Sequence, residues 1–425
     1  MSKSINMNRI LEIVKKETIP ALGCTEPVAV AYAAAVARKY LDGEMDTLDI
    51  KVSKNIYKNG KSVIIPNTGE RGLDLAGGLG VLCGNPEVGL MVLEDVNEDS
   101  IENVHGVLKE DRINVKYIEE TPDVYVEVLA RSKNNEVKVI LKDSHNNIDT
   151  VEVDGNIVYN NNFEKGKTTD EFLKKLSLRE IIDIVETIPI EEIAFIEDGI
   201  KMNKKAAELG INEEKGMGIG FALKELSEEG KINLNGATKA RILTAAAADT
   251  RMGGEICTIM TSAGSGNQGL GVVLPIVAVA EEENLEYEKL IRAVFFAHII
   301  NKYVKLFTGK LSYMCGCGIA AGVGASAGVS WMLGGNIEQI SGACNNMLAN
   351  LTGMICDGAK ETCALKLCTS AEEAVIAAYL ANKNIMPQTG IGIVGNTIEE
   401  TIENIGELCI AGLPSMDSAI IHIIN

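Results

Sequence analysis

Three cysteines, Cys356, Cys363 and Cys368, lie within the sixteen residues "GMICDGAKETCALKLC". Two more, Cys315 and Cys317, lie about forty residues earlier in "MCGCG". Thiolates bind zinc and iron–sulfur clusters, but zinc sites usually contain two tight cysteine pairs, which are missing from this pattern. Iron–sulfur ligands have looser spacing because they come from separate loops. Since cysteine is also common in protein cores, the spacing leaves both an iron–sulfur site and ordinary core packing open.

A second candidate is Cys24, which stands between Gly23 and Thr25 in "PALGCTEPVAV". The apolar run that follows predicts a helix beginning near this cysteine. The dipole of that helix would lower the pKa of the thiol and make Cys24 a nucleophile or a base. The alternative interpretation is a small buried residue beside Thr25 as the N-cap.

Two glycine-rich turns, "IPNTGERGLDLAGGLG" and "TSAGSGNQGLGVVLP", offer backbone N–H groups near predicted helix starts. Such groups bind carboxylates or phosphates. Asn67, Thr68, Ser265 and Asn267 add side-chain donors to these turns. Neither turn matches the GxGxxG or GxxxxGK[ST] nucleotide motifs, and close helix packing is the alternative interpretation.

The four histidines form no spacing typical of a metal site or of a Ser-His-Asp triad. His105 and His145 fall in a strand-rich part of the sequence that we expect to be solvated. His298 lies in the apolar run "RAVFFAHIINKYVKLF" and is typical of a hydrogen-bonded core histidine. The histidines therefore favour no catalytic role.

The elements that must position these residues change character along the chain. Residues 1–45 predict two helices separated by the break that carries Cys24, and residues 47–160 alternate apolar and polar side chains as strands do. Helical patterns dominate after a polar cluster near residue 165. The sequence thus predicts an α+β domain over residues 1–165 and a predominantly all-α domain over residues 166–425.

The composition narrows the range of partners. A net charge of -19 and a sequence pI near 4.8 argue against nucleic acid and anionic membranes. The charge-free stretch 311–336 is rich in glycine and alanine, which favours a buried helix over a membrane span. The first twenty residues lack the pattern of a secretory signal, so we expect a cytoplasmic protein with reduced thiols. Helical surfaces rich in alanine and glycine allow a homodimer.

The segments "ALGCTEP", "IPNTG", "GSGNQG", "CGCGIAAG" and "CDGAKETCALK", in this order, resemble the L-cysteine desulfidases. That family is similar to the iron–sulfur-dependent L-serine dehydratases, and the resemblance runs through nearly the whole chain. It implies a 4Fe-4S cluster held by three cysteines, with one iron open to the substrate. Cys356 and Cys363 match the family pattern CDGAKxxC, and Cys317 matches the third ligand better than Cys315. Cys344 and Cys368 match no ligand and are expected in the core.

The resemblance also implies the reaction, which is β-elimination of L-cysteine to pyruvate, ammonia and hydrogen sulfide. Cys24 as a thiolate would be the base. From their donor chemistry, and not from the resemblance, we expect Asn67, Thr68, Ser265 and Asn267 to hold the carboxylate of this small amino-acid substrate. The Gly-Cys-Thr-Glu-Pro motif, the short spacing of Cys356 and Cys363 and the lack of a terminal cysteine depart from the serine enzymes. L-serine dehydration on the same cluster and non-catalytic amino-acid binding by a regulatory protein are the alternatives.

Overall fold

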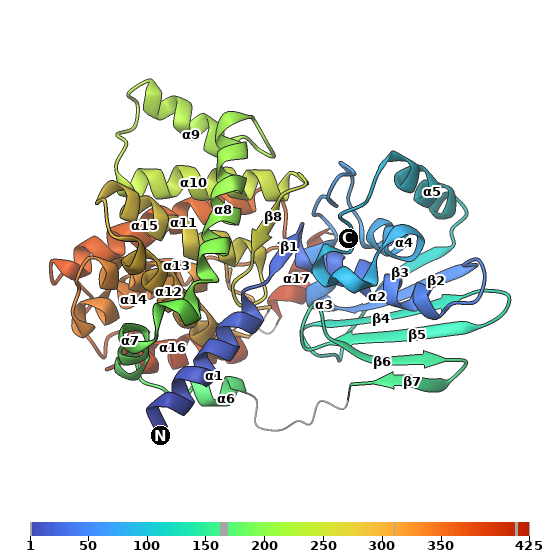
Figure 1. The fold of residues 1–425 in the computed structure, drawn as a ribbon, viewed down its shortest axis with the longest axis horizontal. Helices are drawn as coiled ribbons and strands as arrows, with labels where there is room; N and C mark the ends of the chain where they lie inside the picture. The colour runs from blue at the N-terminus through green and yellow to red at the C-terminus, as the bar shows by residue number, and fades with distance from the viewer. Residues whose placement is uncertain (1, 162–168, 310, 413–414, 425) are drawn as a thin grey trace.

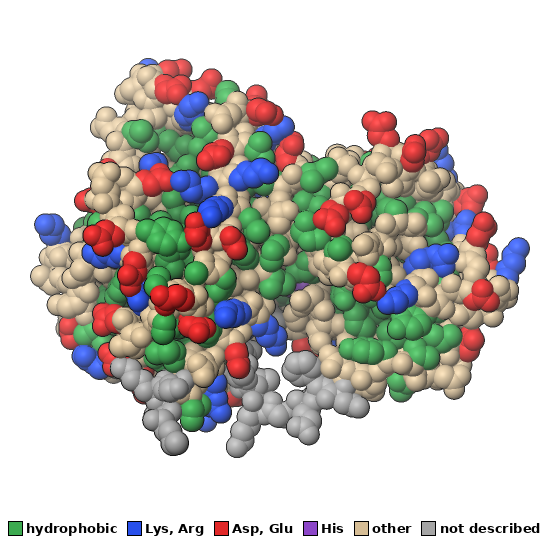
Figure 2. All heavy atoms as spheres, viewed as in Figure 1, with side chains coloured by type: hydrophobic (Ala, Val, Ile, Leu, Met, Phe, Trp, Pro, Cys, Tyr) green, Lys and Arg blue, Asp and Glu red, His purple; other side chains and the backbone are tan. Residues whose placement is uncertain are grey.

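The predicted order of a sheet-containing part followed by a helical part is confirmed (Figure 1). The structure is a computed structural model that describes residues 2–161, 169–309, 311–412 and 415–424. The predicted boundary near residue 165 lies outside these described residues. The two parts lie side by side and touch (Figure 1 and Figure 2), and the chain crosses from one to the other several times.

The N-terminal part is built on a six-stranded sheet with the order β3-β2-β4-β5-β6-β7. Strands β2 and β3 are parallel and the other neighbours are antiparallel. The bounds are β2 Thr47–Ser53, β3 Ile113–Ile118, β4 Tyr125–Arg131, β5 Glu136–Lys142, β6 Ile148–Val153 and β7 Asn156–Asn160. Buried and partly exposed residues alternate along β4 and β5, which is the pattern of a sheet covered on one face.

Helix α2 covers the apolar face of this sheet. Its buried alanines and valines pack against Val126, Val128 and Val139 of the central strands. The opposite face carries ion pairs such as Lys51 with Glu127, which are 2.6 Å apart. The helices of this part are α2 Thr25–Tyr40, α3 Lys54–Gly60, α4 Leu73–Cys83, the 3-10 turn η1 Pro86–Met91 and α5 Glu98–Lys109.

The C-terminal part is a helical assembly around one large apolar core. Its elements are α6 Thr169–Leu173, α7 Leu178–Thr187, η2 Ile190–Ile193, α8 Ile196–Asn212, α9 Ile219–Glu228, α10 Gly236–Met252, α11 Gly266–Glu282, α12 Tyr287–Thr308, α13 Ala320–Met332, α14 Ile337–Leu351, α15 Cys363–Asn382, α16 Ile398–Glu407, η3 Leu408–Gly412 and α17 Met416–Ile424. Small residues let these helices approach closely, because a Cβ atom on Gly324 would lie 2.5 Å from the carbonyl oxygen of Ala297.

The middle of the charge-free stretch forms helix α13, Ala320–Met332, whose residues are almost all buried, as predicted. Across the described ranges, no single helix is long and apolar enough to cross a membrane. One bent pair, Ile398–Gly412 with Met416–Ile424, passes that test by length and composition alone.

The first helix packs in the C-terminal part, and the last described helix packs against the N-terminal part. Helix α1, Ser2–Glu17, packs its Ile10 and Val14 into the helical core, although the sequence assigned this segment to the first domain. Strand β1, Pro20–Leu22, pairs with β8, Thr258–Met260, beside the contact between the parts (Figure 1). Helix α17 contacts α3 in the N-terminal part. These crossings bring residues from distant segments to one place.

Candidate active site

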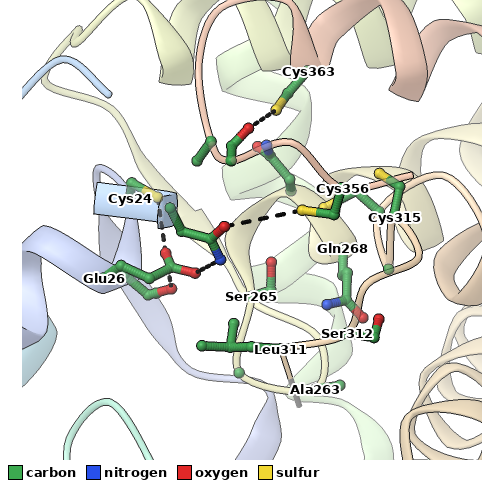
Figure 3. A pocket seen from close by; sticks show the side chains of 18 of the residues that line it. Cys24, Glu26, Ala263, Ser265, Gln268, Leu311, Ser312, Cys315, Cys356 and Cys363 are labelled. Carbon is green, nitrogen blue, oxygen red and sulfur yellow. Dashed lines mark hydrogen bonds between the residues drawn. The ribbon is translucent and has the colours of Figure 1, made fainter. Parts of the chain in front are cut away.

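A cavity lies where the two parts meet, and it collects most of the predicted site residues (Figure 3). They come from the start of α2, the turn before α11, the loop before α13 and the loop before α15. The predicted residues in its lining are Cys24, Ser265, Asn267, Cys317, Cys356 and Cys363, and Cys315 joins them. Residues that are more than two hundred positions apart in the sequence therefore face one space.

The thiols in this cavity influence one another's ionisation. A hydrogen bond from Cys317 is the main cause that lowers the pKa of Cys315 to about 6. Burial raises the pKa of Cys356, and it raises that of Cys363 to about 12, with a further rise in both from the charge of Cys315. Cys344 and Cys368 are buried outside the cavity lining, as expected of core residues.

The thiols are the part of this cavity that could hold a metal cofactor. No group of three or more His, Cys, Asp or Glu side chains converges on one ion within the part of the chain that is described. A cluster spreads its thiolate ligands over a larger body, and its usual protein ligands are thiolates from separate loops, which is what this cavity offers. Its described walls therefore suit a thiolate-bound group.

Three lysines surround the thiols with positive charge. Lys58 donates to the carbonyl oxygen of Cys356 over 3.3 Å, and Lys366 donates to that of Ile355 over 3.0 Å. Lys305 lines the cavity, where burial lowers its pKa. Cations close to thiolates stabilise the charged form of sulfur, so these lysines suit a site that holds several thiolates.

Cys24 is the N-cap residue of α2, so its predicted place at a helix start is confirmed. The thiol donates to Oε2 of Glu26 over 2.9 Å (Figure 3). Burial and the charge of Glu26 raise the pKa of Cys24 well above its ordinary value, although the charge of Arg251 lowers it. The prediction of a lowered pKa is therefore wrong for these surroundings, because burial beside a carboxylate outweighs the helix dipole.

Glu26 is a site residue that the sequence reasoning missed. Its Oε1 atom accepts from Asn59 over 2.9 Å, and Thr25 donates to Oε2 over 3.2 Å. Burial acts to raise the pKa of Glu26, but the charge of His145 and the hydrogen bonds from Cys24 and Asn59 lower it. An acidic residue in the first turn of a predicted helix, directly after the cysteine motif, was the available signal.

The turn before α11 places two predicted residues in the cavity in different ways. Ser265 is the N-cap of α11 and follows the left-handed residues Ala263 and Gly264, with φ of 47° and 75°. Asn267 lines the cavity, but its Oδ1 atom accepts from Nη1 of Arg251 over 2.6 Å. The side chain of Asn267 is thus already engaged by a protein group.

Asn67 and Thr68 do not belong to the cavity lining. Thr68 donates its hydroxyl to the carbonyl oxygen of Ile65 over 2.9 Å, and the amide of Asn67 donates to the carbonyl oxygen of Val96. Both side chains are thus engaged by backbone carbonyl groups, and their predicted contact with a substrate carboxylate stays a prediction that the cavity lining does not support.

The burial of the histidines agrees with the prediction for His298 and differs from it for His145. His298 is buried, and its Nδ1 atom lies 2.8 Å from the hydroxyl of Ser262, as a core histidine should be. His105 lies at the surface, 3.0 Å from Glu70. His145 was expected to be solvated, but it is 7% exposed and lines the cavity, because its loop folds back against the contact between the two parts.

Comparison with known proteins defines the class to which this fold and cavity belong. A family model described as serine dehydratase alpha chain matches residues 87–422, which is well over half of the chain. The chain belongs to the serine dehydratase alpha chain family.

Its relatives extend the match to the whole chain. A "UPF0597 protein" of Clostridium botulinum (strain Okra / Type B1) is 52% identical over 425 residues, covering 100% of this chain and 98% of the relative. Proteins of the same name from Clostridium tetani and Alkaliphilus metalliredigens are 38% and 41% identical, over 98% and 97% of this chain and 99% and 94% of the relatives.

Proposed function

We propose that this protein is a carbon–sulfur lyase that releases sulfide from L-cysteine by β-elimination. One observation carries the proposal, which is that Cys24 lies in the same cavity as Cys317, Cys356 and Cys363. A proton-transferring side chain and a set of thiolate ligands are the two devices this reaction needs. The family match supports an elimination that acts on the β-substituent of an amino acid.

Cys317, Cys356 and Cys363 would hold a 4Fe-4S cluster with three thiolates, which would leave one iron without a protein ligand. When bound, the cluster supplies a Lewis-acidic iron that makes the β-substituent a better leaving group. Lys58 and Lys366 hold the backbone of the loop that carries Cys356, through the carbonyl oxygens of Cys356 and Ile355. The chain therefore fixes the ligand loop by contacts that do not involve the thiols.

The proton chemistry falls to Cys24 and Glu26. The thiol proton of Cys24 passes to Oε2 of Glu26 along their hydrogen bond, and Sγ accepts the α-proton of the substrate. The electron pair of the broken C–H bond forms the Cα–Cβ double bond, and the C–S bond breaks with its electrons on sulfide. The aminoacrylate product tautomerises and reacts with water to give pyruvate and ammonia.

L-serine is the second candidate substrate, and the name of the matched serine dehydratase family favours it. The same proton transfer would apply, with water instead of sulfide as the leaving group. The resemblance of "GCTEP" and "CDGAKETC" to the cysteine desulfidases favours L-cysteine.

The test is to reconstitute the full chain with iron and sulfide without oxygen, and to supply L-cysteine or L-serine. We expect pyruvate and sulfide in equal amounts from L-cysteine, and a much lower kcat/KM for L-serine. Cys24→Ala and Cys356→Ala should abolish turnover, whereas Cys83→Ala, outside the cavity lining, should not. Pyruvate from L-serine alone would establish the alternative, and tight binding without turnover would establish a regulatory protein.

A further inference from the structure

A buried arginine at the cavity has no acidic partner. Arg251 lies in the last turn of α10, is 3% exposed and lines the cavity. No carboxylate within the described ranges forms an ion pair with it, whereas Arg241 of the same helix pairs with Glu372 over 2.5 Å. A buried cation without an anion is costly, so a ligand that brings a negative charge would be favoured here.

The contacts of Arg251 orient its guanidinium without neutralising it. Nη2 donates to the carbonyl oxygen of Gly23 over 2.6 Å, and Nη1 donates to Oδ1 of Asn267 over 2.6 Å. The buried Nε atom has no partner among the described residues. Because these acceptors are neutral and the guanidinium has further N–H donors, the group retains both its charge and unused donors.

Glycine at position 266 keeps space beside this guanidinium. A Cβ atom on Gly266 would lie 2.5 Å from Nε of Arg251 and 2.6 Å from its Cζ atom. Any side chain there would displace the guanidinium. The carboxylate of Glu26, which also lines the cavity, already accepts hydrogen bonds from Cys24, Thr25 and Asn59.

The cavity also holds an acceptor that lacks a donor. Gln268 is 4% exposed and lines the cavity, and its Oε1 atom has no partner in the described structure. Its side chain lies beside Ser312 in Figure 3, with Ser265 on the same helix one turn before it. A buried acceptor without a donor favours a ligand that carries N–H groups.

We infer that Arg251 and Gln268 bind the head group of an α-amino acid zwitterion, with Arg251 donating to the carboxylate and Oε1 of Gln268 accepting from the ammonium group. The choice of an amino acid as the ligand rests on the proposed function. The observation that the cavity offers a cation without an anion, Arg251, and an acceptor without a donor, Gln268, does not depend on that function. Asn267 then acts as a positioning residue that orients Arg251. Substrates without a carboxylate or without an amine should be rejected.

Calorimetric titration of the full chain with three matched probes tests this inference. L-alanine carries both charged groups without a leaving group, propionate lacks the amine and ethylamine lacks the carboxylate. Arg251→Gln should weaken L-alanine binding by about tenfold to a hundredfold, because a hydrogen-bonded charge is lost. Gln268→Met should weaken L-alanine and leave propionate unchanged. Arg241→Gln, on the same helix, is the control and should leave all three affinities unchanged.

An unchanged affinity for L-alanine in Arg251→Gln would overturn the inference. If that variant does not fold, Arg251→Lys keeps the charge but loses the planar donor group, and we expect roughly tenfold weaker binding of L-alanine. An unchanged affinity in the folded lysine variant would overturn the inference equally. Arginine-dependent binding of L-alanine without any sulfide release would support this subsite while removing the proposed reaction. Sulfide release together with binding that does not depend on Arg251 would support the proposed reaction and overturn this subsite.

Discussion

The thiol of Cys24 donates to the carboxylate of Glu26 across 2.9 Å inside a buried pocket wall. Two neighbouring acids in a dry environment resist ionising together, so the pair carries one negative charge and one proton. Burial and the charge of Glu26 raise the pKa of Cys24, while hydrogen bonds help to lower that of Glu26, which assigns the charge to the carboxylate. In this arrangement the carboxylate is the group that can receive the thiol proton.

Glu26→Gln should therefore make the Cys24 thiol more reactive toward alkylation and, at the same time, slow turnover. The amide keeps a hydrogen bond to Cys24 but removes the negative charge, so the pKa of the thiol should fall and its alkylation at pH 8 should become faster. Turnover should decrease by about a hundredfold or more, because the proton acceptor is lost. Alkylation of the Cys24 peptide is followed by mass spectrometry, and kcat by sulfide release. Glu87→Gln, at the surface, is the control, and an unchanged kcat in Glu26→Gln would refute the role.

Iron binding should depend on individual thiols. We expect about four irons per reconstituted chain, and almost none after replacement of Cys356, Cys363 or Cys317 by alanine. Cys368→Ala is the matched control, because this thiol is buried nearby and donates to the carbonyl oxygen of Leu365. Iron loss in Cys315→Ala with retention in Cys317→Ala would transfer the third ligand position to Cys315.

The buried ion pair between Lys58 and Asp417 should be sensitive to the loss of one partner. Their side chains are 1% and 6% exposed, and the atoms Nζ and Oδ1 are 2.5 Å apart. Asp417→Asn leaves an uncompensated ammonium group, so unfolding should become easier by about 3–5 kcal/mol. Urea unfolding followed by circular dichroism measures the change. An identical midpoint in Asp417→Asn would contradict it, while Glu87→Gln, which breaks an exposed pair with Lys39, should not move the midpoint.

Acid should weaken the fold partly through His298. Burial lowers the pKa of His298 from 6.5 to about 3, so between these pH values the unfolded chain binds a proton that the folded chain does not. Stability is therefore lost as the pH falls below 6.5, by about 2 kcal/mol at pH 5. His298→Asn should remove this part of the pH dependence of the urea midpoint. An equally steep dependence in the variant would show that other groups cause it.

Gly266→Ala should impair ligand binding without removing any polar group. The added Cβ atom would collide with Nε of Arg251, so the guanidinium must move away from its partners Asn267 and Gly23. We expect roughly tenfold weaker L-alanine binding, since a displaced charge-assisted hydrogen bond is comparable to a lost one. Gly106→Ala, where a Cβ atom meets nothing within 4 Å, is the control in calorimetry.

Local features of the site were accessible from the sequence. The start of α2 at Cys24 and the cysteine ligand candidates follow from short segments, and helix signals depend on neighbouring residues. Asn67 and Thr68 were expected at the site but lie outside the cavity lining. The donor chemistry of a side chain does not reveal which backbone groups it already contacts.

The remaining site residues depend on packing between distant segments. Arg251 reaches Gly23 across 228 positions of the sequence, and no periodicity predicts that contact. The pKa of Cys24 was predicted wrongly for the same reason. The sequence reveals the dipole of the local helix, but it does not reveal how deeply the cavity wall is buried. Helix α1 was predicted correctly as a helix, but its apolar face packs into the other part of the molecule.

The position of Asp417 near the end of this sequence has a consequence for protein synthesis. Lys58 leaves the ribosome well before its buried partner on α17, which is translated more than 350 residues later. Until then the ammonium group beside the Cys356 loop lacks the carboxylate with which it forms its buried ion pair. Lys58 can therefore enter the interior as an ion pair only after α17 has been translated and has docked against α3.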